Sequence, residues 1–386
     1  MKIIFLAHCP EMYGANLSLY NLIIQLKKKY KIEPVVVVNG KGELSDHLKK
    51  EHIRVYILSY WTSYVTLNKG HVRLRKTVKL FLRIPTYFIV YLKLRKENNV
   101  SFIHSNSSVI DLGYYLSRWM KIPHIWHIRE FGEEDYNLSP IDDRRSLQKK
   151  YMATEWIVAI SGEIERKVRS IAGKCNLVSI SNGVIIPAEY RKKPSNDTVR
   201  FCAIGKIHKG KNQLEIVKAC KELSRQQNEN YHLTLIGDGD EAYISQIRKY
   251  IDENALGENI TLTGYVRNAA DLLCSYDVGI ISSVKEAFGR VTVEYMANYM
   301  PVIGTDSGGT KELIREGING FLYSYGDCMQ LSKCMEYFIC NRDKILEMGS
   351  KARKVSLEYS VEKNADKIYE LYRSNLANGK KQKKQS

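Results

Sequence analysis

Short β-branched runs alternate with longer amphipathic stretches along this chain, and the alternation occurs in two separate series. The first series contains residues 3–7, 34–38, 55–58, 102–105, 124–127 and 156–160. The second contains residues 199–204, 232–236, 260–262, 278–281, 301–304 and 320–322. Alternation of this kind predicts βαβ units and a parallel sheet. Two series therefore predict an α/β protein with two Rossmann-like domains, whose ligand would bind in a cleft that faces both sets of strand carboxyl ends.

The length of 386 residues fits two domains of ~100–200 residues each. We expect an N-terminal domain over residues 1–183, a linker over 184–198 and a C-terminal domain over 199–360. Residues 361–376 are predicted to form a helix that could cross back to the N-terminal domain. The last segment, 377–386, contains four Lys and is predicted to be a disordered basic tail.

The net charge of +17 is unevenly distributed. Residues 1–200 contain 33 Lys and Arg against 18 Asp and Glu, so the excess lies mainly in the first half of the chain. A uniform basic coat for nucleic acid is therefore disfavoured, and we expect no nucleic-acid partner.

The beginning of the chain, MKIIFLAHCP, has an apolar stretch too short for a signal-peptide core. No window approaches the ~18 apolar residues of a membrane span. The eight Cys form no C-x2-C pair, which is typical of reduced thiols. These features favour a cytoplasmic protein that is at most peripheral on the inner face of a membrane.

The sharpest motif is EAFGRVTVE, residues 286–294, which follows a predicted strand and leads into an apolar helix. A turn at Phe288 and Gly289 would offer backbone N–H groups and the positive end of the helix dipole to a phosphate. Glu294, one to two turns into the helix, could reach a pair of vicinal hydroxyls. The alternative is a surface-loop Glu286 and an unrelated helix Glu294.

A second motif is GKIHKGKNQ, residues 205–213, which lies between a predicted strand and a helix. Lys206, Lys209 and Lys211 follow the carboxyl end of the strand, where a ligand is expected to bind. Their charges could balance a leaving diphosphate. The alternative is a solvated basic loop.

These motifs, with DSGGTKE at 306–312 and LTLIGDGDE at 233–241, resemble the nucleotide-sugar site of retaining glycosyltransferases of family 4, of the polysaccharide-biosynthesis type. That family has the GT-B fold. The resemblance therefore implies that residues 1–183 form the acceptor-side domain and residues 199–360 the nucleotide-sugar-binding domain. The resemblance covers most of the second half of the chain. The first half is similar more loosely, through Tyr13-Gly14-Ala15, HSNS at 104–107, HIRE at 127–130 and SNGV at 181–184.

The resemblance implies a role for individual residues on the donor side. Glu286 and the neighbouring Ala287 would line the donor sugar, and the amides of Phe288 and Gly289 would bind the diphosphate. Glu294 would bind the ribose.

The resemblance also implies roles for residues of other loops. Lys206 and Lys211 would neutralise the leaving nucleoside diphosphate, with Lys206 at a position where the family has Arg. The backbone of Val266 would face the base, and Gly14 would lie in the Gly-rich loop near the phosphates.

His127 ends a predicted strand, and in the resembled family a His there contacts the donor sugar near the reacting carbon. With Glu286, Lys206 and Lys211 it forms our predicted catalytic set. A structural His is the alternative. The acceptor-side candidates are Tyr13, at a position where the family often has a second Gly, together with Arg129 and Glu130. These last two could pair with each other or line the acceptor site.

The resemblance implies a retaining glycosyltransferase, acting from a nucleotide-diphosphate donor onto a saccharide or lipid-linked saccharide acceptor. A front-face route is favoured because no carboxylate near His127 stands out as a nucleophile. The sequence has no His/Cys cluster, and a diphosphate held by lysines and a helix N-terminus needs no divalent ion, so we predict no cofactor and no required metal. We also favour a UDP-sugar over a GDP-sugar. The alternatives are a GT-B-like nucleotide-sugar epimerase or phosphorylase, or a noncatalytic basic protein that binds a membrane or polyanion.

Residues 69–96 carry nine Lys and Arg and no acid. Helical spacing groups Arg75, Lys76, Lys79 and Arg83 near one face, and Leu74, Val78, Phe81 and Leu82 near another, with an interruption expected at Pro85. The basic face could lie on an anionic membrane surface. The alternative is a helix packed on the sheet, with its basic face in solvent.

Overall fold

The computed structural model describes residues 1–385 except 68–69, 189–197 and 227–229, and it leaves the side chains of Tyr136 and 378–385 undescribed. The chain divides into two compact units. Unit 1 contains Met1–Gly183 and Val361–Ser386, and unit 2 contains Val184–Ser360. Most of the expected linker, 184–198, lies outside the described residues.

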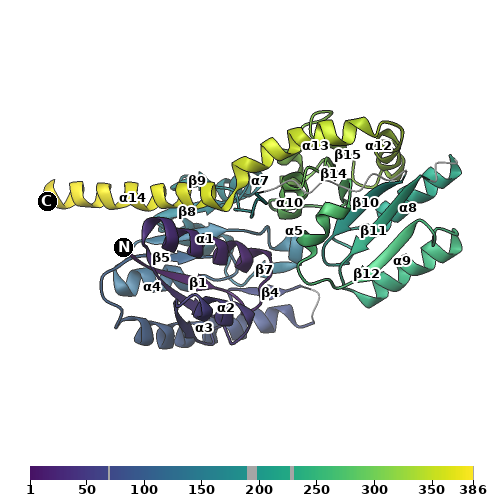
Figure 1. Cartoon of the computed structure of the whole chain (residues 1–386). Coiled ribbons are helices and arrows are strands. Elements are labelled where there is room, and N and C mark those ends of the chain that lie inside the picture. Colours follow the sequence, from purple (N-terminus) through teal and green to yellow (C-terminus); the bar gives the residue numbers. More distant parts are fainter. Residues whose placement is uncertain (68–69, 189–197, 227–229, 386) are drawn as a thin grey trace. The chain divides into compact units, whose positions relative to one another are not determined.

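Unit 1 is built on a parallel sheet of seven strands in the order β3-β2-β1-β5-β6-β8-β9. Figure 1 labels β1, β5, β8 and β9 of this sheet. The strands are β1 Lys2–Ala7, β2 Glu33–Val38, β3 Arg54–Ile57, β5 Val100–Ser105, β6 His124–Ile128, β8 Trp156–Ala159 and β9 Leu177–Ser179. The six strands expected in this half are all present. The structure adds β9 and a two-stranded antiparallel pair, β4 Tyr64–Thr66 with β7 Leu138–Pro140.

The two faces of this sheet are both buried, because alternate side chains of a strand point to opposite faces. In β1, Ile3 and Phe5 belong to one hydrophobic cluster, whereas Ile4 and Leu6 belong to another. A strand with both faces covered reads as a continuous apolar run, and this explains the VVVV sequence of β2.

The helices of unit 1 cover these two faces. They are α1 Gly14–Tyr30, α2 Glu43–Lys50, α3 Val72–Leu94, α4 Leu112–Met120, α5 Glu133–Tyr136, α6 Arg144–Met152, α7 Gly162–Ala172 and α14 Val361–Gln385. The last helix joins the cluster on the α1 side through Ile368 and Tyr372, and Tyr369 stacks on Tyr30 with 3.7 Å between ring centroids. The helix expected to end at residue 376 thus continues to Gln385, where a disordered tail was expected.

Helix α3 corrects two sequence predictions. The helix continues through Pro85, whose missing N–H leaves the carbonyl of Phe81 without its helical partner. Both residues lie on the exposed face, where water can solvate that carbonyl.

The expected basic face is also not in solvent. Arg75 donates to the carbonyl of Thr66 at 3.0 Å, Lys76 to Ser139 Oγ at 2.9 Å and Lys79 to Thr62 Oγ1 at 2.8 Å. These three cations therefore face the protein.

Arg83 belongs to a buried ionic cluster that fixes α3 to the unit. Its guanidinium pairs with Asp111 at 2.9 Å and with Asp142 at 2.6 Å, and Lys150 pairs with the same two carboxylates at 2.5 and 2.6 Å. Tyr87, one turn further along α3, donates to Asp111 at 2.7 Å. Two cations and two anions balance one another, which is the condition under which buried charges are tolerated.

Unit 2 is built on a second parallel sheet, of six strands in the order β12-β11-β10-β13-β14-β15. The strands are β10 Val199–Ile204, β11 Tyr231–Ile236, β12 Ile260–Gly264, β13 Val278–Ile281, β14 Val302–Thr305 and β15 Gly320–Tyr323. These are the six expected strands. The helices are α8 Gln213–Arg225, α9 Glu241–Glu253, α10 Arg290–Ala297, α11 Gly308–Leu313, α12 Cys328–Cys340 and α13 Asp343–Ser356, with short 3-10 helices η1 Ala269–Ser275 and η2 Leu357–Tyr359.

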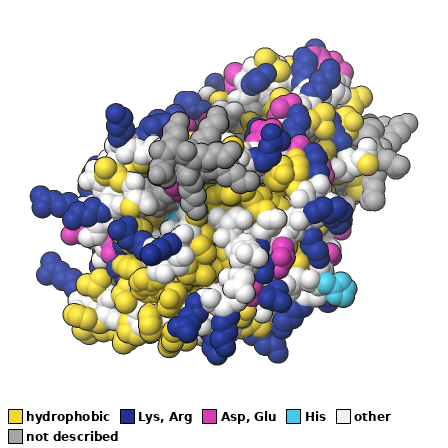
Figure 2. All heavy atoms as spheres, turned by 90° about the vertical axis from the view of Figure 1, so that its left-hand side faces the viewer, with side chains coloured by type: hydrophobic (Ala, Val, Ile, Leu, Met, Phe, Trp, Pro, Cys, Tyr) yellow, Lys and Arg dark blue, Asp and Glu magenta, His cyan; other side chains and the backbone are white. Residues whose placement is uncertain are grey.

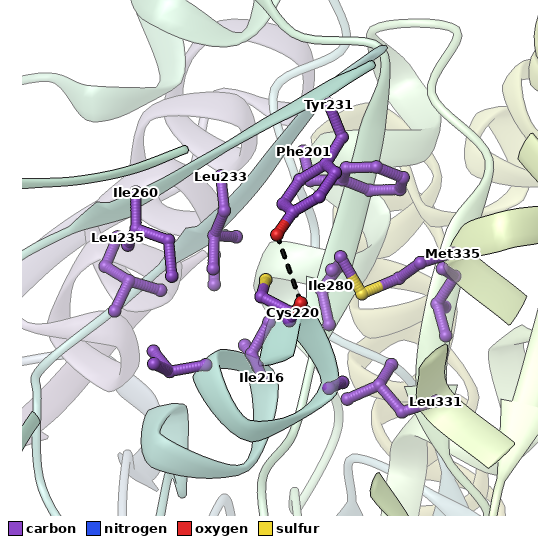
Figure 3. Close-up of a cluster of buried hydrophobic side chains, with 14 of the residues drawn as sticks. Phe201, Ile216, Cys220, Tyr231, Leu233, Leu235, Ile260, Ile280, Leu331 and Met335 are labelled. Carbon is purple, nitrogen blue, oxygen red and sulfur yellow. Dashed lines mark hydrogen bonds between the residues drawn. The ribbon is translucent and has the colours of Figure 1, made fainter. Parts of the chain in front are cut away.

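The core of unit 2 lies between this sheet and helices α8, α9 and α12. Figure 3 shows Phe201 and Leu233 of the sheet, Ile216 of α8 and Met335 of α12 pointing into one cluster. Tyr231 lies in the same core and donates its hydroxyl proton to the carbonyl of Cys220 at 3.2 Å, so its polar atom is satisfied. A packed core therefore supports the strands of unit 2 and fixes the positions of their carboxyl ends.

Candidate functional site

The two donor-side motifs lie in the loops after β10 and β13, which are adjacent strands. From β10 the chain adds β11 and β12 on one side of the sheet. It then crosses over and adds β13, β14 and β15 on the other side, so the strand order reverses between β10 and β13. Open parallel sheets bind ligands at the carboxyl ends of such strands. The loops 205–212 and 282–289 thus occupy the usual ligand position of unit 2.

Hydrogen bonds hold these two loops together. Ser282 Oγ donates to the carbonyl of Lys211 at 2.7 Å, and the N–H of Val284 donates to the carbonyl of Gly210 at 3.0 Å. The backbone itself therefore brings Lys211 next to the beginning of the EAFG segment.

Glu286 and Lys211 form an ion pair at this junction, and Ser283 Oγ also donates to Glu286 Oε1 at 2.6 Å. Burial by itself would raise the pKa of Glu286. The charge and hydrogen bond of Lys211, with the Ser283 hydroxyl, outweigh burial and hold the pKa of Glu286 below its usual range. The carboxylate is therefore ionised at neutral pH and can accept hydrogen bonds from hydroxyl groups.

Helix α10 begins beside this pair. Gly289, at φ 87°, precedes its first residue, and no side chain of the described residues caps the N-terminus. A side chain at Gly289 would be strained at this backbone angle. The first-turn amides of α10 and the positive end of its dipole can therefore attract an anion such as a diphosphate.

The segment with Glu286 and Phe288 is held from its other side by the beginning of α11. The N–H of Gly309 donates to the carbonyl of Glu286 at 2.7 Å. A Cβ at Gly309 would lie 2.6 Å from Phe288 Cα, and one at Gly308 would lie 2.4 Å from the Glu286 carbonyl oxygen. Only glycine at these two positions of DSGGTKE lets the backbone of α11 approach the backbone of residues 286–288 this closely. The motif therefore has a structural role.

Glu294 lies in the second turn of α10 and pairs with Arg290 Nε at 2.9 Å. Burial raises the pKa of Glu294, and the charge and hydrogen bond of Arg290 oppose the rise. Arg290 was not among the expected site residues, although its i,i+4 spacing from Glu294 is a readable signal.

The other predicted donor-side residues lie around this centre. Lys206 is exposed, and its carbonyl accepts a hydrogen bond from Gln213 at 3.0 Å. Ala287 lies between Glu286 and Phe288 and is half-buried, and Phe288 is buried. Val266 follows the carboxyl end of β12. Strand β11 lies between β12 and β10, so Val266 is at the same end of the sheet as the 205–212 loop but two strands away.

In unit 1, His127 is fully buried near the end of β6. Its neighbours determine both the charge of its imidazole and the nitrogen that carries the proton. Arg129 Nη2 lies 3.3 Å from His127 Nδ1, and His104 Nε2 lies 3.3 Å from the same atom. Burial lowers the pKa of His127 well below its usual value, and Arg129 and His104 lower it further. The imidazole is therefore neutral.

The tautomer follows from these contacts. A guanidinium can only donate, so His127 Nδ1 accepts and the proton lies on Nε2. His104 Nε2 then donates to His127, and His104 Nδ1 accepts from the Tyr372 hydroxyl at 2.6 Å. His127 Nε2 is buried and has no hydrogen-bond partner among the described residues. His127 thus presents an N–H donor that a hydroxyl oxygen of a ligand could satisfy.

Arg129 and Glu130 are both fixed by protein groups. Arg129 donates to Asn106 Oδ1 at 2.7 Å and to Asn182 Oδ1. Glu130 Oε1 accepts from Ser107 Oγ at 2.5 Å and from the N–H of Ser108 at 2.6 Å. These contacts join the ends of β5 and β6 to the segment at Asn182.

Tyr13 and Gly14 form the beginning of α1, in the loop after β1. Tyr13 is 73% exposed. A Cβ at Gly14 would meet nothing within 4 Å, so packing within the unit does not require glycine there. Asn106 Nδ2 donates to the carbonyl of Ala15 at 3.0 Å, which ties this loop to the Arg129 network. Strands β1 and β5 are the point at which the order of this sheet reverses.

Sequence reasoning assigned no role to His104, Asn106, Asn182 or Tyr372. The first three lie in the HSNS and SNGV segments, at the ends of predicted strands, and their polar character was a usable signal. Tyr372 was not predictable, because 268 residues separate it from His104.

Two kinds of site are absent from the described part of the chain. No group of three or more His, Cys, Asp or Glu side chains there could hold a metal ion. No helix there has the length and apolar character needed to cross a membrane.

Comparison with known proteins finds a family match within unit 2. Residues 187–355 match the family model described as Glycosyl transferases group 1. The putative glycosyltransferase EpsD of Bacillus subtilis is 25% identical over 166 residues, which is 43% of each chain. The N-acetyl-alpha-D-glucosaminyl L-malate synthase of Bacillus anthracis is 30% identical over 142 residues, 37% of this chain and 34% of the other. The matches thus span less than half of these two relatives.

Among solved structures, Anabaena HepE in complex with UDP superposes with a TM-score of 0.78 at 20% identity, covering 97% of this chain and all of the other. The fold is GT-B. The predicted fold class is confirmed, and two Rossmann-like units with parallel sheets account for it.

Proposed function

We propose that this protein is a retaining glycosyltransferase that moves a sugar from a nucleotide-diphosphate donor to a saccharide or lipid-linked saccharide acceptor. The observation that carries the proposal is the Lys211–Glu286 ion pair beside the uncapped beginning of α10, at the reversal point of the unit 2 sheet. A cation, an ionised carboxylate and a helix N-terminus together can bind a diphosphate and the hydroxyls of its sugar.

In this proposal Lys211, Lys206 and the first amides of α10 stabilise the leaving diphosphate, which needs no divalent ion. Glu286 and Ala287 line the donor sugar, Glu294 binds the ribose and Val266 faces the base. His127 donates its Nε2–H to a sugar hydroxyl, and Gly14 lies near the phosphates. Tyr13, Arg129 and Glu130 remain candidates for the acceptor side. A UDP-sugar is the favoured donor, and HepE, which is similar in fold, is known in complex with UDP.

We further propose a cytoplasmic role in polysaccharide or lipopolysaccharide assembly. A lipopolysaccharide core biosynthesis glycosyltransferase of Rhizobium meliloti, 23% identical over 222 residues, is a relative that supports this role. We favour a front-face route for retention, because no described carboxylate near His127 stands out as a nucleophile and the adjacent Glu130 is held by hydrogen bonds from Ser107 and Ser108.

The test is a transfer assay with UDP-glucose, UDP-galactose, UDP-N-acetylglucosamine and GDP-mannose, in the presence of EDTA and of saccharide or lipid-linked acceptors. We expect acceptor-dependent release of UDP from one donor, and a product with the donor's anomeric configuration by NMR. Conversion of the donor without an acceptor would instead indicate an epimerase, and a requirement for inorganic phosphate would indicate a phosphorylase.

A further inference from the structure

Helix α3 of unit 1 has the reverse of the usual amphipathic orientation. Its inward stripe recurs every three or four residues and contains Lys76, Lys79, Arg83, Tyr87, Val90 and Leu94. Its outward stripe has the same spacing and contains Leu74, Val78, Phe81, Leu82, Phe88, Ile89 and Leu92, all exposed. Large apolar side chains therefore cover the solvent face of this helix, where polar ones are expected.

The apolar surface continues from α3 onto α4 through aromatic side chains. Trp119 of α4 contacts Phe88 and Tyr91 of α3, with ring centroids 5.9 and 5.7 Å apart. In Figure 2 hydrophobic side chains gather in the lower left part of the molecule, at the height at which Figure 1 shows α3, and Lys and Arg side chains border them. Tyr and Trp beside an apolar patch suit a boundary between lipid and water.

The exposed charged residues at the two ends of α3 are all positive. Arg73 lies at the beginning of α3 and is exposed, and Lys93, Arg95 and Lys96 lie at its end and are exposed. No Asp or Glu occurs between residues 69 and 96. Two copies of this surface would bring like charges together, whereas an anionic lipid headgroup complements them.

We propose that the outward stripe of α3, continued by Trp119, docks on the surface of an anionic bilayer. The apolar side chains would enter the boundary between headgroups and acyl chains by ~5–10 Å, with the cations at both ends of the helix among the headgroups. The internal hydrogen bonds of Lys76, Lys79 and Arg83 hold the stripe outward. The cations predicted from the sequence to contact lipid thus position the helix, and its apolar residues make the contact.

The test is co-sedimentation with vesicles of phosphatidylcholine alone, and with vesicles containing 30% phosphatidylglycerol at ~50 and ~500 mM salt. We expect binding to the anionic vesicles that weakens at high salt. The triple variant Leu74→Gln, Phe81→Gln, Ile89→Gln should bind at least about tenfold more weakly, because it removes exposed apolar area. The variant Lys93→Gln, Arg95→Gln, Lys96→Gln should lose about 100-fold at low salt.

A matched control replaces three exposed apolar residues elsewhere, with the substitutions Met152→Gln, Ile185→Gln and Leu346→Gln. These residues are 56–60% exposed, close to the 55–72% of the α3 set, and the control should bind as the wild type does. Binding needs no donor and no turnover, so the result is independent of the proposed enzymatic function. Failure of the wild type to bind anionic vesicles would overturn the proposal. So would equal binding by the α3 variant, or a dimer in sedimentation velocity that only the α3 variant dissociates.

Discussion

Replacing Lys211 by Met is expected to lower the kcat of sugar transfer by about 10²- to 10³-fold, the range seen when one preorganised electrostatic group is removed from a transition state. In our proposal the Lys211 ammonium neutralises charge that develops on the leaving diphosphate. The backbone contacts of Ser282 and Val284 involve carbonyl groups of the basic loop and should persist in the variant. The measurement is UDP release at saturating donor and acceptor.

The same substitution should change the pH dependence, because Lys211 is the main group that opposes the effect of burial on Glu286. Without it, burial raises the pKa of Glu286, so the carboxylate takes up its proton at a higher pH. The acid limb of the pH–rate profile should therefore move to higher pH in Lys211→Met. Lys218→Met, at an exposed position on the following helix α8, is the matched control and should leave kcat and the acid limb unchanged. A Lys211→Met enzyme within about threefold of wild-type kcat would contradict the role given to Lys211.

Replacing Arg83 by Met is expected to destabilise unit 1 by about 3–5 kcal/mol, the usual cost of removing one partner from a buried ion pair. The variant would leave Asp111 and Asp142 buried with Lys150 as their only cation in the cluster. In the wild type burial alone would raise the pKa of Asp142, and the opposing Arg83 and Lys150 hold it below its usual range. That contribution to stability is present above the unfolded pKa and is lost as the pH falls through the folded pKa.

Tryptophan fluorescence during urea unfolding measures the free energy of unfolding of unit 1. The four Trp residues, at positions 61, 119, 126 and 156, all lie in unit 1. Arg73→Met, on the exposed beginning of the same helix, should change stability by no more than about 0.5 kcal/mol. A second replacement, Asp142→Leu, should recover part of the loss by restoring charge balance. A loss below about 1 kcal/mol in Arg83→Met would show that the cluster does not hold α3.

The sheets were predictable because each central strand is a short apolar run between turn signals. The strands that were missed, β4, β7 and β9, have three residues each, too few for a periodic pattern to emerge. The loops with Lys211 and Glu286 could be assigned to one site because both follow predicted strands. Which two strands are neighbours is a property of the sheet, and only the structure gives it.

The orientation of α3 could not be predicted, although both of its faces were. Helical spacing separates the cations from the apolar residues, but it does not say which face packs on the protein. The partners of Arg83, Asp111 and Asp142, lie 28 and 59 residues further along the chain. Their buried carboxylates bind Arg83, so the cationic face of α3 packs on the protein and the apolar face points outward. The link from Tyr372 to His127 escaped prediction for the same reason.

The central claim, that unit 2 binds a nucleoside diphosphate through α10, is tested most directly by differential scanning calorimetry with UDP and GDP. The wild type, Glu294→Ala and a matched control, Glu253→Ala at an exposed position of α9, are compared without metal. A diphosphate at 100 times its dissociation constant should stabilise the wild type and the control by about 2.7 kcal/mol. Glu294→Ala should lose most of this shift, because the ribose hydroxyls lose their carboxylate. No shift with either diphosphate, or an undiminished shift in Glu294→Ala, would contradict the account.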